Sequence, residues 1–536
     1  MSQDTSQNNK GIAKNSLMLY IRMFLTLGIK LYTSRVILVA LGVEDFGIYN
    51  AVAGVITLFT FVNSSMINST QRFLTFALGK NDKKQVHEVF CTSINVHAII
   101  SLLIVLLGET VGLYILNCHM VIPEHRIYAA NWIYQFTVIS AVIGIMSVPY
   151  NALIIAHEKM EAFAYITIVE VVLQLFVALL TGMYDTGDRL ILYAFLIASC
   201  SVFIRCIYGL YCSKKFAESK YHFFIDKKLL TQMTSFAGWT VIGTFSYMGY
   251  TQGLNILLNM FFGPIVNAAN GIALQVQSSA LGFSSNIQKA INPQITKNYA
   301  ANNQDYMMKL IYASTKFSFL LLWLIVLPLI FDADILLRIW LGNVPDYTRE
   351  FIILTLFTSI ICCGANPIIT AIQATGNIRK YQIIEGIILI SIIPITYLLL
   401  QYKRSPFIVF LVPLTIHTVA QVARCILLKQ QIHYSMEDYF KRNIIPMILQ
   451  IAVSFTIAYM LIGMVTVDGL WHLCMVVLIT VIVNLVLAIF ILLNKSERNM
   501  LKKYYKSGKN KTKKLVVKIG VAKKIGSSPN SVGRVF

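Results

Sequence analysis

Long apolar runs, separated by short polar connections, extend along almost the whole of this 536-residue sequence. Hydrophobic residues make up 57% of the chain and charged residues 13%, whereas soluble domains carry roughly 25% charged residues. A soluble protein could not bury this much apolar side chain, and a run of about 20 apolar residues is long enough to cross a bilayer as a helix. The sequence therefore predicts an all-α polytopic membrane protein.

Hydropathy predicts about fourteen transmembrane helices. The expected spans are residues 15–40, 47–68, 91–116, 128–155, 162–182, 189–212, 235–262, 265–288, 309–331, 350–374, 382–400, 405–428, 443–463 and 469–493. Residues 1–14 are polar, and the first apolar run lacks a small-residue cleavage site. We therefore expect no cleavable signal peptide.

Lys and Arg residues are concentrated in every second loop. Placing the N-terminus in the cytoplasm puts these loops on the cytoplasmic side, as the positive-inside rule requires. The opposite loops then contain only six basic residues, which are Arg126, Arg189, Arg338, Arg349, Lys403 and Arg404. Both termini are therefore expected in the cytoplasm. The basic tail 494–536 is expected to be solvated beside the anionic leaflet, and it lacks the interleaved aromatics of a nucleic-acid-binding segment.

Two segments of the first half recur about 220 residues later. I-N-S-T-Q-R-F-L-T-F-A-L-G-K-N-D (67–82) resembles I-N-P-Q-I-T-K-N-Y-A-A-N-N-Q-D (291–305), and P-Y-N-A-L-I-I-A-H-E-K (149–159) resembles P-I-I-T-A-I-Q-A-T-G-N-I-R-K (367–380). The repeat predicts two six-helix bundles in the same orientation. Parallel repeats of this kind place a substrate site between the two halves, near the middle of the membrane.

The predicted organisation follows from this repeat and from the hydropathy. It comprises an N-terminal segment 1–14, an N-terminal bundle 15–212, a cytoplasmic linker 213–234, a C-terminal bundle 235–428, two further transmembrane helices within 443–493, and the basic tail 494–536.

Two predicted spans carry polar residues along one helical face. Span 47–68 has Asn50, Thr57, Thr60, Ser64 and Asn68, and span 265–288 has Asn267, Asn270, Gln277, Ser278, Ser285 and Gln288. A polar side chain that faces lipid has no hydrogen-bond partner, so these faces must meet another helix or water. Interhelical hydrogen bonding is one interpretation. A water-filled cavity shared by the two spans is the one we favour.

Charged residues within the predicted spans are candidates for function, because intramembrane charge is costly. Span 15–40 contains Arg22, Lys30 and Arg35 and no acid, and Lys316 lies in span 309–331. These four bases are the candidate substrate-binding residues, since Lys and Arg pair well with phosphate oxygens. A cavity that combines bases with amides and hydroxyls suits an anionic, sugar-like substrate.

Acidic residues are fewer in the spans, and two of them occupy similar places in the two halves. These are Glu170 in span 162–182 and Glu385 in span 382–400. Each is a candidate for ion coupling, and each could instead neutralise a neighbouring Arg or Lys.

Cofactor and metal chemistry have no motif in this sequence. The cysteines form no C-x-x-C pair and the histidines no H-E-x-x-H motif. We therefore expect neither a metal nor a cofactor. The loops are too short for an extramembrane catalytic domain, so an enzyme such as a glycan polymerase is disfavoured.

Three segments resemble the Wzx-type polysaccharide flippases. T-S-R-V-I-L-V-A-L-G-V-E-D-F-G-I-Y-N (33–50) is similar to the end of helix 1 and the start of helix 2 in that family. Q-R-F-L-T-F-A-L-G-K-N-D (71–82) resembles its turn after helix 2, and S-V-P-Y-N-A-L-I-I-A-H-E-K (147–159) its helix 4 proline motif. The resemblance covers the first twelve predicted spans, and Arg35 matches the Arg of the family pattern.

The resemblance implies membership of the multidrug/oligosaccharidyl-lipid/polysaccharide exporter superfamily. It implies that an undecaprenyl-diphosphate-linked oligosaccharide for O-antigen, capsule or exopolysaccharide is carried across a bacterial inner membrane by alternating access. Membrane lipids and other glycan-assembly proteins are the further partners it implies.

Two alternatives remain within the same superfamily. A multidrug exporter would share the twelve-helix core, but such exporters usually bind cations through an acid in helix 1, where this chain has only bases. A lipid II flippase would share the fourteen spans and the basic cavity.

Overall fold

The computed structural model describes residues 2–59, 61–118, 120, 122–224, 226–341, 344–432, 435–467, 469–494 and 497–498. These residues form helices and contain no strand, which confirms the all-α fold class. The chain divides into two compact units, residues 1–440 (unit 1) and residues 441–536 (unit 2).

Unit 1 contains most of the helices. In chain order they are α1 (Ser2–Phe59), α2 (Phe61–Gly79), α3 (Lys83–Leu107), η1 (Gly108–Gly112), α4 (Leu113–Cys118), η2 (Glu124–Arg126), α5 (Ile127–Ala156), α6 (Met160–Gly182), α7 (Arg189–Lys215), η3 (Ala217–Ser219), α8 (Lys227–Ala300), α9 (Gln304–Leu341), α10 (Thr348–Thr375), α11 (Arg379–Ile390), α12 (Ile392–Tyr402), α13 (Ile408–Gln431) and α14 (Met436–Tyr439). The π-helix η4 (Phe440–Ile444) leads into unit 2, which contains α15 (Ile445–Ile462), α16 (Leu470–Leu487) and η5 (Ala488–Leu492).

Eleven helical segments in the described part of the chain are long and apolar enough to cross a membrane. The chain is therefore a multi-pass membrane protein, but the count of fourteen spans stays a prediction. The long helix α8, which corresponds to predicted spans 235–262 and 265–288, is not among the eleven. Its two halves carry several Asn, Gln, Ser and Thr residues.

The two longest helices, α1 and α8, are each divided into two segments by a glycine. Gly42 in α1 has φ 79° and ψ 170°, and Gly263 in α8 has φ 78° and ψ −174°. This backbone region is open essentially only to glycine, because a Cβ atom would clash with the chain. Each long helix therefore consists of two helices that meet at a glycine kink.

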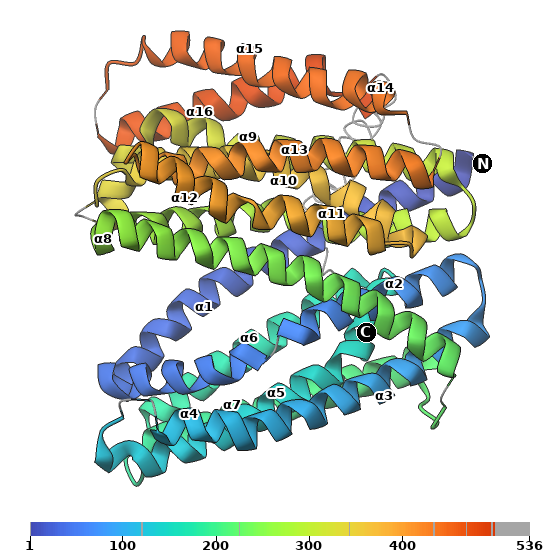
Figure 1. Cartoon of the computed structure of the whole chain (residues 1–536), viewed down its shortest axis with the longest axis vertical. Helices are drawn as coiled ribbons and strands as arrows, with labels where there is room; N and C mark the ends of the chain where they lie inside the picture. The colour runs from blue at the N-terminus through green and yellow to red at the C-terminus, as the bar shows by residue number, and fades with distance from the viewer. Residues whose placement is uncertain are drawn as a thin grey trace, which may run out of the picture. The chain divides into compact units, whose positions relative to one another are not determined.

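The backbone repeats itself at the spacing found in the sequence. Gly42 and Gly263 are 221 residues apart, as are the two asparagines with φ of 56°, Asn81 and Asn302. Glu158 (φ 59°) and Gly376 (φ 81°) are 218 residues apart. Figure 1 shows α1–α7 in one part of unit 1 and α8–α13 in another. We call these the N-half and the C-half; the residue bounds of the two predicted bundles stay a prediction.

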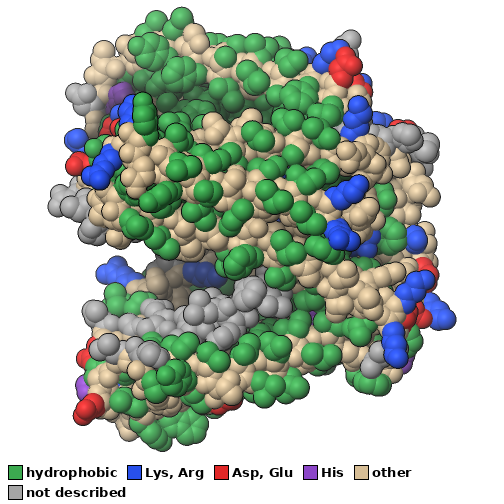
Figure 2. Space-filling view, in the orientation of Figure 1, with side chains coloured by type: hydrophobic (Ala, Val, Ile, Leu, Met, Phe, Trp, Pro, Cys, Tyr) green, Lys and Arg blue, Asp and Glu red, His purple; other side chains and the backbone are tan. Residues whose placement is uncertain are grey.

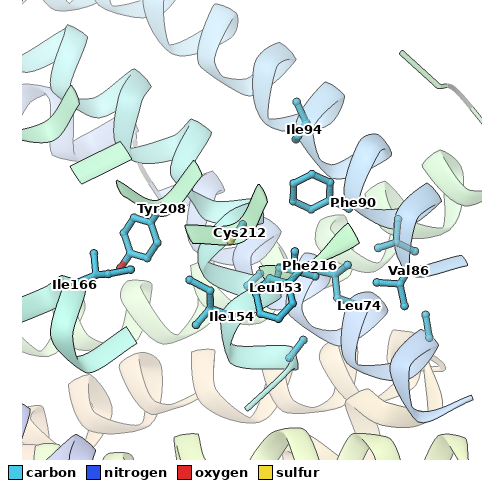
Figure 3. Packing of buried hydrophobic residues seen from close by; sticks show 14 of the residues in the cluster. Leu74, Val86, Phe90, Ile94, Leu153, Ile154, Ile166, Tyr208, Cys212 and Phe216 are labelled. Atoms are coloured by element: carbon cyan, nitrogen blue, oxygen red, sulfur yellow. The ribbon is translucent and has the colours of Figure 1, made fainter. Parts of the chain in front are cut away.

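Two packed cores hold the N-half together. One contains Leu74, Phe90, Leu153 and Phe216, which α2, α3, α5 and the linker after α7 bring into contact (Figure 3). The other contains Ile37, Val52, Ile133 and Tyr134, among others. Packing of this kind is what holds helices together in lipid, where no hydrophobic driving force acts between them.

Asp45, one of the two acids in the segment 33–50, belongs to an ion cluster. Arg126 Nε donates to Asp45 Oδ1 (2.8 Å), and its Nη1 donates to Asp188 Oδ2 (2.8 Å). Asp188 also caps α7 by accepting from the amide of Leu190 (2.9 Å). Asp45 thus ties the chain after the Gly42 kink to the starts of α5 and α7.

Candidate functional site

The two ends of unit 1 differ in charge and in openness. We call the end formed by turns 79–83, 156–160, 215–227, 300–304 and 375–379 the basic end. In the view of Figure 2, Lys and Arg side chains gather on the right of unit 1, and a hollow opens on the left of unit 1. The hollow lies between the N-half and the C-half.

Direct contacts join the two halves at the basic end. Arg72, near the end of α2, donates through Nε to the carbonyl of Gln373 (3.1 Å) and through Nη2 to the carbonyl of Ala374 (2.9 Å). These carbonyls belong to the last turn of α10, where backbone acceptors lack helical partners and a cation is favourable. Gly376 allows this approach, because a Cβ there would lie 2.6 Å from Arg72 Nη2.

Aromatic rings surround the Arg72 guanidinium. Its central carbon lies 4.6 Å from the ring centre of Phe73, 4.9 Å from that of Phe76 and 5.6 Å from that of Phe236 in α8. Burial lowers the pKa of Arg72 to about 10, so the group remains charged at neutral pH. Phe236 comes from the C-half, so the rings themselves bridge the two halves.

A second contact mirrors the first with the halves exchanged. Glu158, in the turn after α5, forms an ion pair with Lys297 near the end of α8. Its other carboxylate oxygen accepts from Gln294 Nε2 (2.6 Å). The two contacts are equivalent in the repeat. In each, a base that follows the second predicted span of one half meets the chain at the end of the fourth predicted span of the other half. We call the two contacts the paired latches.

The middle of α1 adds further links between the halves. The Tyr20 hydroxyl donates to the carbonyl of Phe283 (2.7 Å), and Arg22 Nη2 donates to Asn286 Oδ1 (3.3 Å). Together with the paired latches, these links close the basic end of unit 1, and the hollow in Figure 2 lies at the opposite end.

Arg22 and Lys30, two of the predicted binding residues, belong to one charged group in the N-half. Lys30 is exposed and interacts electrostatically with Glu170 on α6. Tyr208 on α7 lies within electrostatic reach of both Glu170 and Arg22, and Lys289 on α8 within reach of Arg22. Of these bases, Lys30 is the one that interacts with the acid Glu170, and we call Arg22, Lys30, Lys289 and Glu170 the α1 charge group.

Arg35 and Lys316 are placed elsewhere. Arg35 is exposed on α1, about 140° around the helix from Lys30. Lys316 is fully buried within α9. That Lys316 contributes to a substrate-binding cavity stays a prediction.

The polar face of α8 after the Gly263 kink is only partly open. Asn270 Nδ2 donates to Asn255 Oδ1 across the Gly263 kink (2.6 Å), and Gln277 Nε2 donates to Ser359 Oγ on α10 (2.8 Å). Both line a cavity of about 80 Å³ inside the C-half. For these two residues the structure shows interhelical hydrogen bonds, the alternative to a cavity shared with span 47–68.

The remaining polar candidates have less defined surroundings. Ser278 is exposed and donates to the Gln275 carbonyl (2.9 Å), while Ser285 is half-buried and donates to the Gly282 carbonyl (3.0 Å). Asn68 is exposed. The side chains of Asn50, Thr57, Ser64 and Asn267 lie outside the described residues.

Glu385 is committed to an ion pair. Its Oε1 lies 2.6 Å from Arg424 Nη2 on α13, and both side chains are almost fully buried. The structure therefore shows the charge-neutralising alternative for Glu385, whereas Glu170 has Lys30 as an exposed basic neighbour.

Among the residues that the structure describes, one cluster could hold a metal ion. His87 and Cys91 on α3 and His222 in the linker bring three potential ligand atoms within 4.8 Å of one another. No sequence motif pointed to this cluster, because His222 lies far along the chain from the other two residues.

Sequence reasoning also missed the residues that close the basic end. Arg72, Glu158 and Lys297 lie within the repeated segments of the sequence, where no motif assigns them a function. The signal that could have found them is the repeat itself, since Arg72 and Lys297 lie in matching repeat segments.

Comparison with known proteins agrees with these features. Residues 10–272, from α1 into α8, match the family model described as polysaccharide biosynthesis protein. This match supports membership of the polysaccharide biosynthesis protein family. No curated protein matches the sequence at a significant level.

Solved transporter structures share the fold of this chain. An outward-facing multidrug resistance MATE family transporter of the MOP superfamily has 13% identity and a TM-score of 0.68, covering 79% of this chain and 95% of its own. A MATE protein in the bent conformation has 14% identity and a TM-score of 0.66, with 79% and 95% covered. A MOP superfamily transporter from Pyrococcus furiosus, described as having a binding pocket of reversed polarity, has 13% identity and a TM-score of 0.64, with 78% and 95% covered. Family and fold together support a membrane transporter.

Proposed function

We propose that this protein is a flippase that moves an undecaprenyl-diphosphate-linked oligosaccharide from the inner to the outer leaflet of a bacterial inner membrane. The substrate serves O-antigen, capsule or exopolysaccharide synthesis, and both termini of the carrier lie in the cytoplasm. Transport proceeds by alternating access between the N-half and the C-half, without covalent chemistry on the substrate.

The α1 charge group is the observation that carries this proposal. The membrane span Lys14–Gly42 carries Lys30, which interacts with the acid Glu170, and Arg22, which lies within electrostatic reach of a further base, Lys289. An uncompensated base inside a bilayer costs about 2.5–3.5 kcal/mol on insertion scales. A phosphate-bearing substrate offsets this cost, since bases pair strongly with phosphate oxygens. A cationic drug would be repelled by the same excess of positive charge.

Replacement of Lys30 tests the proposal. Lys30→Ala should abolish export of the surface glycan while the protein still inserts, and Lys30→Arg should retain partial export because the charge survives in a different geometry. Surface glycan and protein level are measured in a strain that lacks the native gene. Lys84→Ala, which removes an exposed base outside the predicted spans, is the matched control and should export normally.

A purely structural role for Lys30 predicts a different result in a double variant. If Lys30 only neutralises Glu170, the double variant Lys30→Ala/Glu170→Gln should recover export. Under the proposal it should not. Normal export by Lys30→Ala at a normal protein level would overturn the proposal.

Multidrug export is the second candidate, and the likeness to MATE transporters favours it. Deletion of the gene separates the alternatives. Loss of one surface glycan with normal growth supports the proposed flippase, increased drug sensitivity with intact glycan supports the exporter, and lysis supports lipid II as the substrate.

A further inference from the structure

A large cavity opens at the basic end of unit 1. It measures about 1030 Å³ and lies between α2, the first turns of α8 and the turn from α10 to α11. Five basic residues contribute to its wall: Arg72, Lys80, Lys227, Lys228 and Arg379. None of the described residues that line it is acidic.

Aromatic rings support two of these bases. Lys80 Nζ lies 4.7 Å from the ring centre of Phe76, and the Arg379 guanidinium lies 5.1 Å from that of Trp239. Such contacts hold a cation in place without neutralising it. Arg72 is engaged with α10, so the other four bases, all exposed, provide the charge available to a ligand.

Two acids flank the cavity as helix N-caps. Asp226 Oδ1 accepts from the Lys228 backbone amide (2.8 Å) at the start of α8, and Asp82 Oδ1 accepts from the Gln85 backbone amide (2.9 Å) at the start of α3. Basic loops alone would follow from the positive-inside rule. Grouping five bases in one concave wall brings like charges together, however, and an anion in the cavity would relieve their repulsion.

We infer that this cavity binds a phosphate-bearing anion, and that the diphosphate of the lipid-linked substrate docks there while the basic end is closed. The lipid assignment rests on the proposed function, whereas the anion site does not. Four exposed bases exceed the two negative charges of a diphosphate that is esterified at both ends, so they can neutralise it. The positive-inside rule places the cavity on the cytoplasmic side, where the proposed substrate begins its journey.

Two lysine pairs at the same end of the molecule provide a matched test. Lys227→Gln/Lys228→Gln removes two charges from the cavity wall, and Lys214→Gln/Lys215→Gln removes two exposed charges from the last turn of α7, outside it. The full-length protein is placed in nanodiscs of neutral lipid. Binding of a polyprenyl diphosphate, a polyprenyl alcohol and inorganic diphosphate is then measured.

The expected result is at least a roughly tenfold loss of polyprenyl diphosphate binding in the 227/228 variant and little change in the 214/215 variant. Equal losses in both variants would mean diffuse attraction to the basic end and would overturn the site. Equal binding of the diphosphate lipid and the alcohol would do the same. If inorganic diphosphate competes and the lipid does not bind, the lipid assignment is wrong and the anion site stands.

These measurements separate the site from the proposed function. Binding in nanodiscs requires no transport, so normal export by Lys30→Ala would overturn the flippase while leaving the anion site intact. Loss of the 227/228 effect would remove the site while leaving the flippase intact.

The metal-compatible cluster carries a second, independent inference. His87 Nε2 lies 2.8 Å from His222 Nδ1, and Cys91 Sγ lies 3.7 Å from His222 Nδ1 and 4.0 Å from His87 Nε2. Neighbouring ligand atoms around a tetrahedral zinc ion are about 3.3–3.6 Å apart, given bonds of about 2.0–2.3 Å. Small side-chain adjustments would bring the three atoms to this geometry.

The surroundings prepare His87 for this role. Its Nδ1 lies 2.8 Å from the Glu218 carbonyl, which can only accept, so Nδ1 carries the proton and Nε2, which faces His222 Nδ1, has the lone pair that binds a metal. Asn95, one turn beyond Cys91, holds the linker from the other side: it donates to the Phe224 carbonyl (2.8 Å) and accepts from the Tyr221 hydroxyl (2.8 Å). We propose that His87, Cys91 and His222 bind one Zn²⁺ ion, which fastens the linker between the halves to α3.

Metal content tests this second inference. The full-length protein, purified without a polyhistidine tag, is stripped with chelator, reloaded with zinc and assayed by mass spectrometry of the metal. We expect about one zinc ion per chain, lost in His222→Ala and Cys91→Ser and kept in Cys118→Ser, which alters an exposed thiol elsewhere. Cobalt(II) should give a thiolate charge-transfer band that Cys91→Ser abolishes. Equal zinc content in the wild type and His222→Ala would overturn the site.

Discussion

Charged side chains within the helices of unit 1 have different surroundings in its two halves. In the C-half, Glu385 and Arg424 are paired at 2.6 Å and almost fully buried. In the N-half, Lys30 is exposed and interacts with Glu170, and Arg22 is half-buried. A buried pair satisfies itself, whereas a group with excess positive charge can accept an anion. The Glu385–Arg424 pair is therefore a structural contact, whereas the α1 charge group is a candidate binding site.

Arg424→Ala should destabilise the protein strongly. Removal of one partner of a buried ion pair leaves an uncompensated charge and costs about 3–5 kcal/mol. Thermal unfolding in detergent measures the loss. Arg349→Ala, which breaks the exposed pair with Asp334 (2.8 Å), is the control and should cost about 0–1 kcal/mol. Equal effects of the two variants would show that the Glu385–Arg424 pair is not a structural one.

At the scale of elements, the glycine kinks decide where α1 and α8 turn. Gly28 also lies within α1, but the non-helical conformation is at Gly42. No neighbouring atom lies within 4 Å of a Cβ added at Gly42 or at Gly28. The two positions therefore differ in backbone conformation and not in available space.

Gly42→Ala should destabilise the protein by about 1–3 kcal/mol, because alanine at φ 79° and ψ 170° is strained. Gly28→Ala should instead be neutral or stabilising by about 0.5–1 kcal/mol, since alanine is preferred within a helix. Thermal unfolding in detergent compares the two variants directly. A stable Gly42→Ala protein would contradict the kink geometry.

At the scale of the whole of unit 1, the paired latches set which end is open. Arg72 holds the last turn of α10, and Glu158 holds Lys297 and Gln294 near the end of α8. Each latch joins a turn of one half to a helix end of the other. An alternating-access carrier must break both contacts before its basic end can open, so they bias the equilibrium towards the state observed.

Arg72→Ala should shift this equilibrium towards opening at the basic end. Two hydrogen bonds from a charged donor, each worth roughly 1.5–3 kcal/mol, are enough to change a two-state population about tenfold or more. Spin labels at Asn81 and Asn302, in matching turns of the two halves, should report longer distances in a background without native cysteines.

Arg126→Ala provides the control for this measurement. It breaks contacts to Asp45 and Asp188 that lie within the N-half, at the opposite end, so the distance between the labels should not change. An unchanged distance distribution in Arg72→Ala would show that this latch does not hold the basic end closed.

Local composition determined the class of this protein. Apolar runs of helical length predict an all-α membrane protein because a bilayer demands both features, and the structure confirms this class. The motif segments predicted the family, and residues 10–272 match it. The repeated segments that begin at Pro149 and Pro367 also share a backbone feature, because Glu158 in the first and Gly376 in the second both have positive φ. These features depend on residues that are close together in the chain.

Only the tertiary structure decided what each helix face meets. Periodicity places Asn270 and Gln277 on one face of α8, but packing determines that they bond to Asn255 and Ser359. The partners of Arg72, His87 and Glu385 are likewise distant in sequence. A helix's own sequence specifies which residues share a face, while the partner of that face depends on how the other helices pack against it. The latches and the metal-compatible cluster therefore became visible only in the folded chain.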